Sequence, residues 1–419
     1  IPTIATSVPR KAFAWVTKKL MGQVGIPVIT SNRINMPDVA EEVLATGCAD
    51  MVSMARPFLA DADFVNKAAQ GRADEIAPCI ACNQACLDHT FSGKLTSCLV
   101  NPRACHETEL SYDPTDAPKS IAIVGAGAAG LMTAIIAAER GHKVTLFDKA
   151  ARVGGQLNMA REILGKEEFH GLVEWFANMV EKSGVDLRLG VEAGPEDLAG
   201  FDEVVIATGI TPRDPGIPGQ EGPNVVNYID VLRGGAKVGP RAAIVGAGGI
   251  GFDVAEFLTQ AGDSPTENLP DWLTEWGIAD PAEARGGLAP AGPRPEAPAR
   301  QITLLQRKAE RPGKRLGKTT GWIHRTALKM KKVIMLSDVN YERIDTEGLH
   351  ISFGDSHERP TLIEVDTVVL CAGQLPERNL ADALQAAGRA VHVIGGADVA
   401  TELDAKRAID QGTRLAAVL

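Results

Sequence analysis

Short runs of aliphatic residues recur along the chain, and each run ends in small or polar residues. Uninterrupted apolar runs of this length are typical of strands in a parallel sheet that helices cover on both faces. Segments with a 3.6-residue apolar period follow several of these runs, so strand–helix units repeat. The pattern therefore predicts an α/β fold. The predicted strand segments are 121–124, 144–147, 201–209, 241–245, 302–305 and 365–373, and the predicted helices are 131–140, 252–258 and 404–417.

The first 75 residues contain two further strand–helix units, with strands at 26–30 and 50–54. Two units cannot close a sheet, and a (β/α)8 barrel needs about 250 residues. We therefore interpret residues 1–75 as the end of a barrel whose front lies outside this sequence. Loops after the last strands of such barrels often bind a phosphate. A role as ordinary surface cations is the alternative for the two arginines in these loops. The residues at the loop positions are Asn32, Arg33, Ala55 and Arg56.

Four of the seven cysteines gather between positions 79 and 98, with the spacing C-x2-C-x3-C-x11-C. Cysteine thiolates are the ligands of iron–sulfur clusters and of zinc. A structural zinc usually uses two C-x2-C pairs or a mixture of Cys and His. The second pair is absent here, so the compact triplet favours a 4Fe–4S loop. Structural zinc and ordinary buried cysteines are the alternatives. The four residues are Cys79, Cys82, Cys86 and Cys98.

A dinucleotide-binding pattern, G-x-G-x-x-G, begins directly after the predicted strand 121–124. Glycines at these positions permit a tight turn, the approach of a pyrophosphate and close packing of the helix. Asp148 stands at the tip of the next strand, where an acid binds the ribose hydroxyls. The G-G-Q sequence just beyond offers more backbone for close approach. The residues of this pattern are Gly125, Gly127, Gly130, Asp148, Gly155 and Gln156.

A second pattern of the same kind follows the predicted strand 241–245. Its next strand is delayed by residues 262–300, which hold seven prolines and which we interpret as an insertion. Arg307 and Lys308 then stand where an NAD site would have an acid. Two cations accept a 2′-phosphate, so they favour NADPH, and a solvated strand end is the alternative. The glycines of this pattern are Gly246, Gly248 and Gly251.

Composition and charge narrow the class of protein further. The net charge of −10 over 419 residues argues against a nucleic-acid binder or an anionic-membrane binder. No apolar run approaches the roughly 20 residues that span a bilayer, and the first residues lack the features of a signal peptide. Cysteines gathered in one segment do not resemble a disulfide scaffold. We therefore expect a cytoplasmic protein.

These residues together resemble the bacterial NADPH-dependent 2,4-dienoyl-CoA reductase family, within the larger group of barrel flavoenzymes that includes trimethylamine dehydrogenase. The resemblance implies an FMN barrel, a 4Fe–4S cluster, and the FAD and NADPH domains of a two-dinucleotide flavoprotein reductase fold. It implies electron flow from NADPH to FAD, to the cluster, to FMN and to 2,4-dienoyl-CoA, in β-oxidation of unsaturated fatty acids by a monomer. The matching segments are SNRIN, DMVSMARPFLAD, the cysteine loop with SCLVNPRACHE, LGKTTGWIHR and IGGADVATELDAKRAI.

The resemblance also implies roles for individual residues. The four cysteines become cluster ligands, and Arg33, Ala55 and Arg56 become part of the FMN phosphate site. The FAD site comprises Gly125, Gly127, Gly130, Asp148, Gly155, Gln156, Thr208, Gly209, Gly396 and Asp398, and the NADPH site comprises Gly246, Gly248, Gly251, Arg307 and Lys308.

The implied domain order is an FAD-binding domain interrupted by an NADPH-binding domain. The segments are a truncated barrel at 1–75, the iron–sulfur loop at 76–108, a linker at 109–119, the first FAD part at 120–237, the NADPH domain at 238–362 and the FAD return segment at 363–419.

The family's proton donors are a tyrosine and a histidine of the barrel, and residues 1–75 contain neither. A hydride added to a conjugated thioester leaves an enolate-like charge that a positioned acid must protonate. The resemblance therefore implies that the full-length protein is the reductase. This chain would hold no catalytic residue and would keep at most transfer from NADPH to an acceptor. An incomplete barrel would also expose apolar strand faces.

Three other interpretations remain open. A related enzyme of the same architecture could act on an enone or an amine. An electron-transfer module similar to the small subunit of glutamate synthase would feed a partner chain, although the two barrel-like strands speak against it. A structural NADP-binding protein with zinc is the third.

Overall fold

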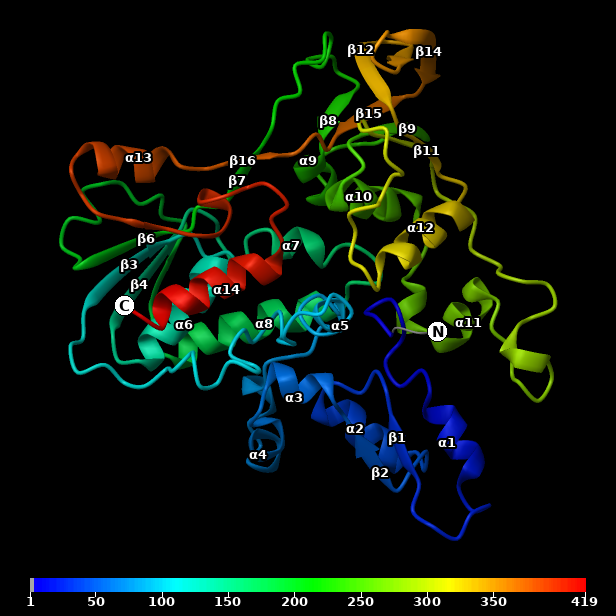
Figure 1. The fold of residues 1–419 in the computed structure, drawn as a ribbon, viewed down its shortest axis with the longest axis horizontal. Coiled ribbons are helices and arrows are strands. Elements are labelled where there is room, and N and C mark those ends of the chain that lie inside the picture. Colours follow the sequence, from blue (N-terminus) through cyan, green and yellow to red (C-terminus); the bar gives the residue numbers. More distant parts are fainter. Residues whose placement is uncertain (1–3) are drawn as a thin grey trace. The chain divides into compact units, whose positions relative to one another are not determined.

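The structure is a computed structural model that describes residues 4–419, and the first three positions of the predicted barrel segment lie outside it. The described residues form two compact units (Figure 1). The larger unit comprises Arg10–Arg161, Glu167–Thr211 and Gln374–Leu419. The smaller unit comprises Pro212–Gly373, the short stretch Glu162–Lys166 and the described residues before Arg10.

The larger unit is built on a five-stranded parallel sheet with the order β17-β6-β3-β4-β5. Side chains alternate across it: Ile121 and Ile123 pack with the helices α6, α8 and α14, whereas Ala122 and Val124 pack on the opposite face near α13. Burial on both faces explains why these strands are continuous apolar runs. The elements are β3 (Ser120–Val124), α6 (Ala128–Glu139), β4 (Lys143–Asp148), α7 (Leu157–Ala160), α8 (Glu168–Lys182), β5 (Asp186–Leu189), β6 (Glu203–Ile206), α13 (Asn379–Ala386), β17 (His392–Val393), η4 (Gly395–Ala397) and α14 (Ala405–Ala416).

The smaller unit has its own parallel sheet, with the order β11-β10-β9-β15-β8. The helix α10 packs on β9 and β10, and a three-stranded antiparallel sheet, β12-β13-β14, shares an apolar core with the parallel sheet. The elements are β8 (Val225–Asn227), α9 (Tyr228–Leu232), β9 (Arg241–Val245), α10 (Gly249–Thr259), η2 (Pro265–Glu267), α11 (Leu269–Trp276), η3 (Arg285–Gly287), β10 (Gln301–Leu305), α12 (Gly321–Met330), β11 (Ile334–Leu336), β12 (Val339–Asp345), β13 (Gly348–Phe353), β14 (Glu358–Glu364) and β15 (Thr367–Leu370).

The edges of the second dinucleotide unit differ from the predicted limits of 238 and 362. Strands β8 and β15 pair inside the second sheet, so residues 212–237 and 363–373 belong to the smaller unit. A glycine pattern marks only the first strand of a sheet, whereas the outer strands come from segments without a motif. The chain passes between the units at β7 (Ile210–Pro212) and β16 (Gln374–Pro376), which pair with each other.

The N-terminal segment of the larger unit contains a two-stranded parallel sheet, β1–β2. Ile29 and Met51 lie opposite each other in this sheet and are 54% and 55% exposed, as expected for strands with no further neighbour. None of the described helices is both long enough and apolar enough to cross a membrane. The elements are α1 (Ala14–Leu20), β1 (Ile29–Ser31), α2 (Pro37–Ala45), β2 (Met51–Ser53), α3 (Arg56–Ala60), α4 (Phe64–Ala69), η1 (Ala73–Glu75) and α5 (Leu87–Thr90).

A buried carboxylate joins this N-terminal segment to the helix α8 of the larger unit. Glu168, in the first turn of α8, is only 4% exposed. Its carboxylate accepts hydrogen bonds from Arg10 at 3.0 and 2.7 Å and from Arg33 at 2.8 Å. The Asn35 amide donates to Glu168 and also to the carbonyl of Cys79, both at 2.9 Å. Asn35 therefore connects the N-terminal segment both to Glu168 of α8 and to the start of the cysteine loop.

The charge of Glu168 depends on these partners. Burial alone would raise its pKa, but the hydrogen bonds from Arg10 and the charges of Arg33 and Arg10 outweigh burial and lower the pKa to about 2. A carboxyl with a lowered pKa stabilises the folded state above its unfolded-state pKa, and this stabilisation is lost as the pH falls toward the folded-state value. The network is therefore fully formed at neutral pH.

We expect Glu168→Gln to lower the free energy of unfolding at pH 7 by about 3–5 kcal/mol, because it leaves two arginines beside a neutral group. Urea denaturation of both proteins measures the difference, with the exposed Glu174→Gln on the same helix as the control. The difference should shrink as the pH falls from about 4.5 toward 2. A loss no larger than that of the control at pH 7 would contradict this account.

Candidate functional site

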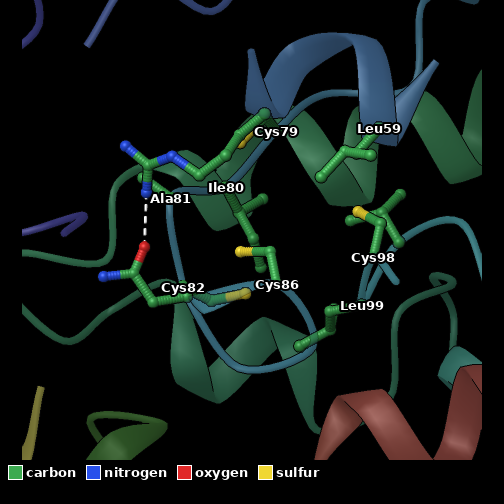
Figure 2. A pocket seen from close by; sticks show the side chains of 11 residues that line it. Leu59, Cys79, Ile80, Ala81, Cys82, Cys86, Cys98 and Leu99 are labelled. Carbon is green, nitrogen blue, oxygen red and sulfur yellow. Dashed lines mark hydrogen bonds between the residues drawn. The ribbon is translucent and has the colours of Figure 1, made fainter. Parts of the chain in front are cut away.

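The four cysteines predicted as ligands line one pocket in the larger unit. Their side chains gather around a common space together with Leu59, Ile80 and Leu99 (Figure 2). The cysteine loop makes sharp turns, because Ala81 and Asn83 adopt φ angles of 51° and 64°. The structure therefore brings together residues that are up to 19 positions apart in the sequence, from 79 to 98.

The pocket is supported by the core of the larger unit. Ile80, Leu99 and Val100 line the pocket and are buried in the same apolar cluster as Leu131 and Met132 of α6. Cys82 and Cys98 pack against that cluster. The cysteine loop therefore shares one apolar core with the helix that follows the first glycine turn.

Cys79 is buried and the other three cysteines of the pocket are half-buried, and backbone amides lie close to their sulfurs. Burial raises the pKa of all four thiols, well above the usual value for Cys82 and to about 12 for Cys98. Hydrogen bonds from backbone amides act in the opposite direction and lower each pKa in part. Donors of this kind stabilise thiolates and set the properties of metal-bound sulfur. The amides belong to Ala81, Gln84, Leu87, Val100 and Asn101.

The distances between the sulfurs decide which group the pocket fits. Four thiolates on one tetrahedral zinc lie about 3.8 Å apart, because each Zn–S bond is about 2.3 Å. In the described part of the chain, no three of the cysteine sulfurs lie within 4.8 Å of one another. The sulfurs are therefore spaced more widely than a single ion requires. This spacing and the donor set of four thiols fit a cluster of several metal atoms.

The two arginines predicted for a flavin phosphate lie beside the cysteine loop. Arg33, with a φ of 53°, pairs with Glu168, whereas Arg56 is the first residue of α3 and donates to Oδ1 of Asn83. Burial is the main influence on the pKa of Cys79, and the charges of Arg56 and Arg33 act against it. The exposed Ala55 is the N-cap residue of α3. The FMN phosphate site stays a prediction.

The first glycine turn has the shape that a pyrophosphate needs. A Cβ on Gly125, where φ is 111°, would lie 2.3 Å from the carbonyl oxygen of Ala207, and a Cβ on Gly130 would lie 1.9 Å from that of Gly125. A Cβ on Gly127 would meet no atom within 4 Å. The first and third glycines are therefore required by packing. The second faces open space in front of α6, where a phosphate can approach its amides.

The remaining residues of the first site lie around this turn. Asp148 accepts the amide of Ala126 at 2.6 Å, so the predicted ribose ligand also fixes the turn. A Cβ on Gly155 would lie 2.9 Å from the Cα of Gly127. Gln156 follows as the N-cap residue of α7 and accepts a hydrogen bond from Gln374 at 3.4 Å. These predicted residues therefore surround the same turn.

The return segment contributes the other side of the first site. A Cβ on Gly396 would lie 2.9 Å from the carbonyl carbon of Gly209, and Thr208 donates to the carbonyl of Glu377 at 2.6 Å. The carboxylate of Asp398 accepts from Gln411 on α14 at 3.0 Å. Segments around 209 and 396 are therefore in contact although they are 187 positions apart in the sequence.

The second glycine turn repeats the first in the smaller unit. Cβ atoms on Gly246 and Gly251 would lie 2.3 Å and 1.8 Å from backbone carbonyl oxygens, whereas a Cβ on Gly248 would meet nothing within 4 Å. Arg307 and Lys308 are exposed at the end of β10, next to β9 where this turn begins. Their position is that predicted for cations that bind a 2′-phosphate.

The sequence did not single out Glu168 or Asn83. Asn83 is fully buried at the cysteine pocket, and its Nδ2 has no hydrogen-bond partner among the described residues. The one feature of the sequence that indicated Asn83 was its position inside the C-x2-C-x3-C spacing. Glu168 carries no motif, because its partners lie 133 to 158 positions earlier.

Two families match this chain. Residues 119–406 match the family described as pyridine nucleotide-disulphide oxidoreductase, and residues 1–75 match the NADH:flavin oxidoreductase / NADH oxidase family. The first match covers more than half of the chain and includes both glycine turns. Together the two matches confirm the predicted fold class.

Characterised proteins resemble the chain over much of its length. It is 37% identical over 403 residues to a metal reductase of Desulforamulus reducens, covering 95% of this chain and 58% of that protein. It is 35% identical over 245 residues to a cinnamate reductase of Clostridium sporogenes, covering 58% of this chain and 36% of that protein. The chain therefore spans little more than half the length of the metal reductase and matches about a third of the cinnamate reductase.

A solved structure resembles the whole chain. The complex of 2-naphthoyl-CoA reductase with 2-naphthoyl-CoA aligns with a TM-score of 0.86 at 25% identity, covering 100% of this chain and 58% of that chain. The likeness includes the segment with the four cysteines and both dinucleotide units.

We expect Gly127→Ala to weaken FAD binding and Gly130→Ala to destabilise the fold. Gly127→Ala should fold normally but weaken FAD binding about tenfold or more, because the methyl group enters the space in front of α6. Gly130→Ala should lower the free energy of unfolding by about 3 kcal/mol even without flavin, because its methyl group clashes with backbone. Flavin-fluorescence titration and urea denaturation of flavin-free protein measure the two effects. Unchanged FAD affinity in Gly127→Ala would refute this assignment of the turn.

Proposed function

The chain belongs to the pyridine nucleotide-disulphide oxidoreductase family, and from this we propose that it binds FAD, NADPH and a 4Fe–4S cluster in a flavin-dependent reductase. The observation that carries the proposal is the shared core of the larger unit. Ala126, inside the first glycine turn, belongs to the same buried cluster as Leu99 and Val100 at the cysteine pocket. A flavin on the turn and a cluster in the pocket would be held by one packed body.

Different residues of the chain would bind the different cofactors. When bound, the nicotinamide, flavin and cluster supply hydride transfer and single-electron transfer. The amides at the N-terminus of α6 would hold the FAD pyrophosphate, and Asp148 would hold its ribose. Arg307 and Lys308 would hold the 2′-phosphate of NADPH. The four cysteines would hold the cluster, with backbone amides directed at their sulfurs.

For the whole protein we propose reduction of a conjugated, unsaturated acid or its CoA thioester, and 2,4-dienoyl-CoA as the substrate within this class. The support is the family resemblance in the sequence, together with the similarity to a cinnamate reductase and to a 2-naphthoyl-CoA reductase complex. Each of those names describes a conjugated substrate. FMN at the loops of Arg33 and Arg56 is part of the same proposal.

A second candidate is the reduction of metal ions as terminal electron acceptors. The relative that supports it is the metal reductase, which aligns over 95% of this chain. Both candidates use the same donor half, with NADPH, FAD and the cluster, and differ only in the acceptor.

We expect anaerobically purified protein to contain about four iron atoms and four sulfides per chain, with one FAD. Cys86→Ser should lose most of the iron, because it removes one of the four ligands. Cys105→Ser should keep the iron, because that exposed thiol lies outside the pocket. Metal analysis, sulfide assay and flavin extraction measure these contents. Zinc in place of iron, or equal iron in both variants, would refute the cluster.

We expect the double variant Arg307→Gln/Lys308→Gln to raise KM for NADPH about tenfold or more and to leave KM for NADH within twofold, because only NADPH carries the 2′-phosphate. NADPH oxidation with ferricyanide as acceptor measures this. Lys329→Gln, which removes an exposed cation of the same unit, is the control. Equal changes for both nucleotides would contradict the assignment. For the whole protein, the same assay with ferric citrate, compared with a conjugated acyl-CoA, separates the two candidate functions.

A further inference from the structure

The Arg56 side chain lies at the cysteine pocket, although its sequence position predicts a role at a flavin phosphate. Arg56 lines this pocket together with all four cysteines. Its Nη1 donates a hydrogen bond to Oδ1 of Asn83, which directly follows Cys82 in the loop. A guanidinium remains charged throughout the working pH range of proteins. One edge of the pocket therefore carries a permanent positive charge.

Both ends of the Arg56 side chain are fixed. Its backbone starts α3, with Pro57 as the next residue. Its guanidinium is held by Asn83, which is 0% exposed and lies in a tight turn with a φ of 64°. A charge that is fixed before a ligand binds acts on that ligand without the cost of ordering a flexible side chain. The arrangement therefore suits an electrostatic role.

Arg56 also differs from the other cation near the pocket. The charge of Arg56 acts on the sulfurs of Cys79 and Cys86. Arg33 acts on Cys79, but its guanidinium forms an ion pair with Glu168 at 2.8 Å, and the carboxylate offsets much of its field. One hydrogen-bond acceptor of Arg56 is the neutral amide of Asn83. Arg56 therefore acts on two sulfurs of the pocket, whereas Arg33 acts on one.

We propose that Arg56 sets the reduction potential of the cluster by stabilising its reduced form. This inference rests on the proposed function, because it requires a cluster on the four cysteines. Reduction adds one electron, supplied by dithionite in the test below, and no proton, so the reduced cluster carries one more negative charge. Net charge near a cluster is one of the determinants of its potential. A fixed cation at its edge favours the more negative state.

The test is a potentiometric titration of the purified 419-residue chain with dithionite, followed by low-temperature electron paramagnetic resonance. Arg56→Gln should shift the reduction equilibrium about tenfold toward the oxidised cluster, which is about 59 mV for one electron. Arg56→Lys should stay within twofold of the parent, because it keeps the charge. The control Arg414→Gln, on a side chain that is 46% exposed and paired with Asp410, should also stay within twofold.

Several outcomes would overturn the inference. A parental potential in Arg56→Gln with full iron content would exclude the charge effect. Equal shifts in Arg56→Lys and Arg56→Gln would show that the hydrogen bond to Asn83 matters instead of the charge. Loss of FMN without a change in the cluster potential would assign Arg56 to the flavin phosphate alone.

A second variant covers the case in which Arg56→Gln holds no iron. Asn83→Asp keeps the acceptor for Arg56 and adds a negative charge at the same edge, so it should shift the equilibrium about tenfold toward the oxidised cluster. That shift, together with a parental equilibrium in Arg56→Lys, would support the inference, and failure of either would overturn it. Absence of iron from the parent would overturn the proposed function as well. Iron in the parent with no shift would overturn this inference alone.

Discussion

The interaction on which the larger unit depends is the burial of one carboxylate, Glu168, between two arginines and an asparagine. A buried carboxylate is costly unless it is paired and fully hydrogen-bonded, and Arg10, Arg33 and Asn35 meet that requirement. The pairing holds the N-terminal segment on α8. Through the bond from Asn35 to the carbonyl of Cys79, it also fixes the start of the cysteine loop.

The same ion pairing changes how the arginines of the N-terminal loops are interpreted. A loop arginine next to a barrel strand predicts a phosphate ligand, but Arg33 is buried in an ion pair and Arg56 lies at the thiol pocket. Both arginines place positive charge near a site that would gather negative charge, since thiolates and sulfides are anionic. The N-terminal segment therefore contributes to the electrostatics of the cysteine pocket as well as to the proposed flavin site.

Local patterns predicted the local features of this chain well. The glycines at 125, 130, 246 and 251 occupy positions where a Cβ would clash with backbone, so only glycine fits there. The four cysteines predicted as cluster ligands line one pocket, and their role as ligands stays a prediction. Parallel strands buried on both faces left continuous apolar runs, which is why β3, β4, β6, β9 and β10 were recognisable.

Features that depend on distant partners were not predictable in the same way. Glu168 has no motif, because its role arises only when α8 packs beside residues 10 and 33. The smaller unit extends beyond its predicted limits at both ends, because β8 and β15 join its sheet from segments that resemble other strands. The orientation of Arg56 toward Asn83 likewise follows from tertiary packing, whereas the sequence showed only a cation after a strand.

The central claim is that this chain carries electrons from a nicotinamide nucleotide to a cluster on the four cysteines. The most direct measurement is low-temperature electron paramagnetic resonance of the anaerobic protein before and after addition of NADPH. The account predicts that NADPH bleaches the flavin absorbance and produces the signal of a reduced 4Fe–4S cluster. Bleaching of the flavin with no iron–sulfur signal, in protein that contains iron and gives the signal with dithionite, would contradict it.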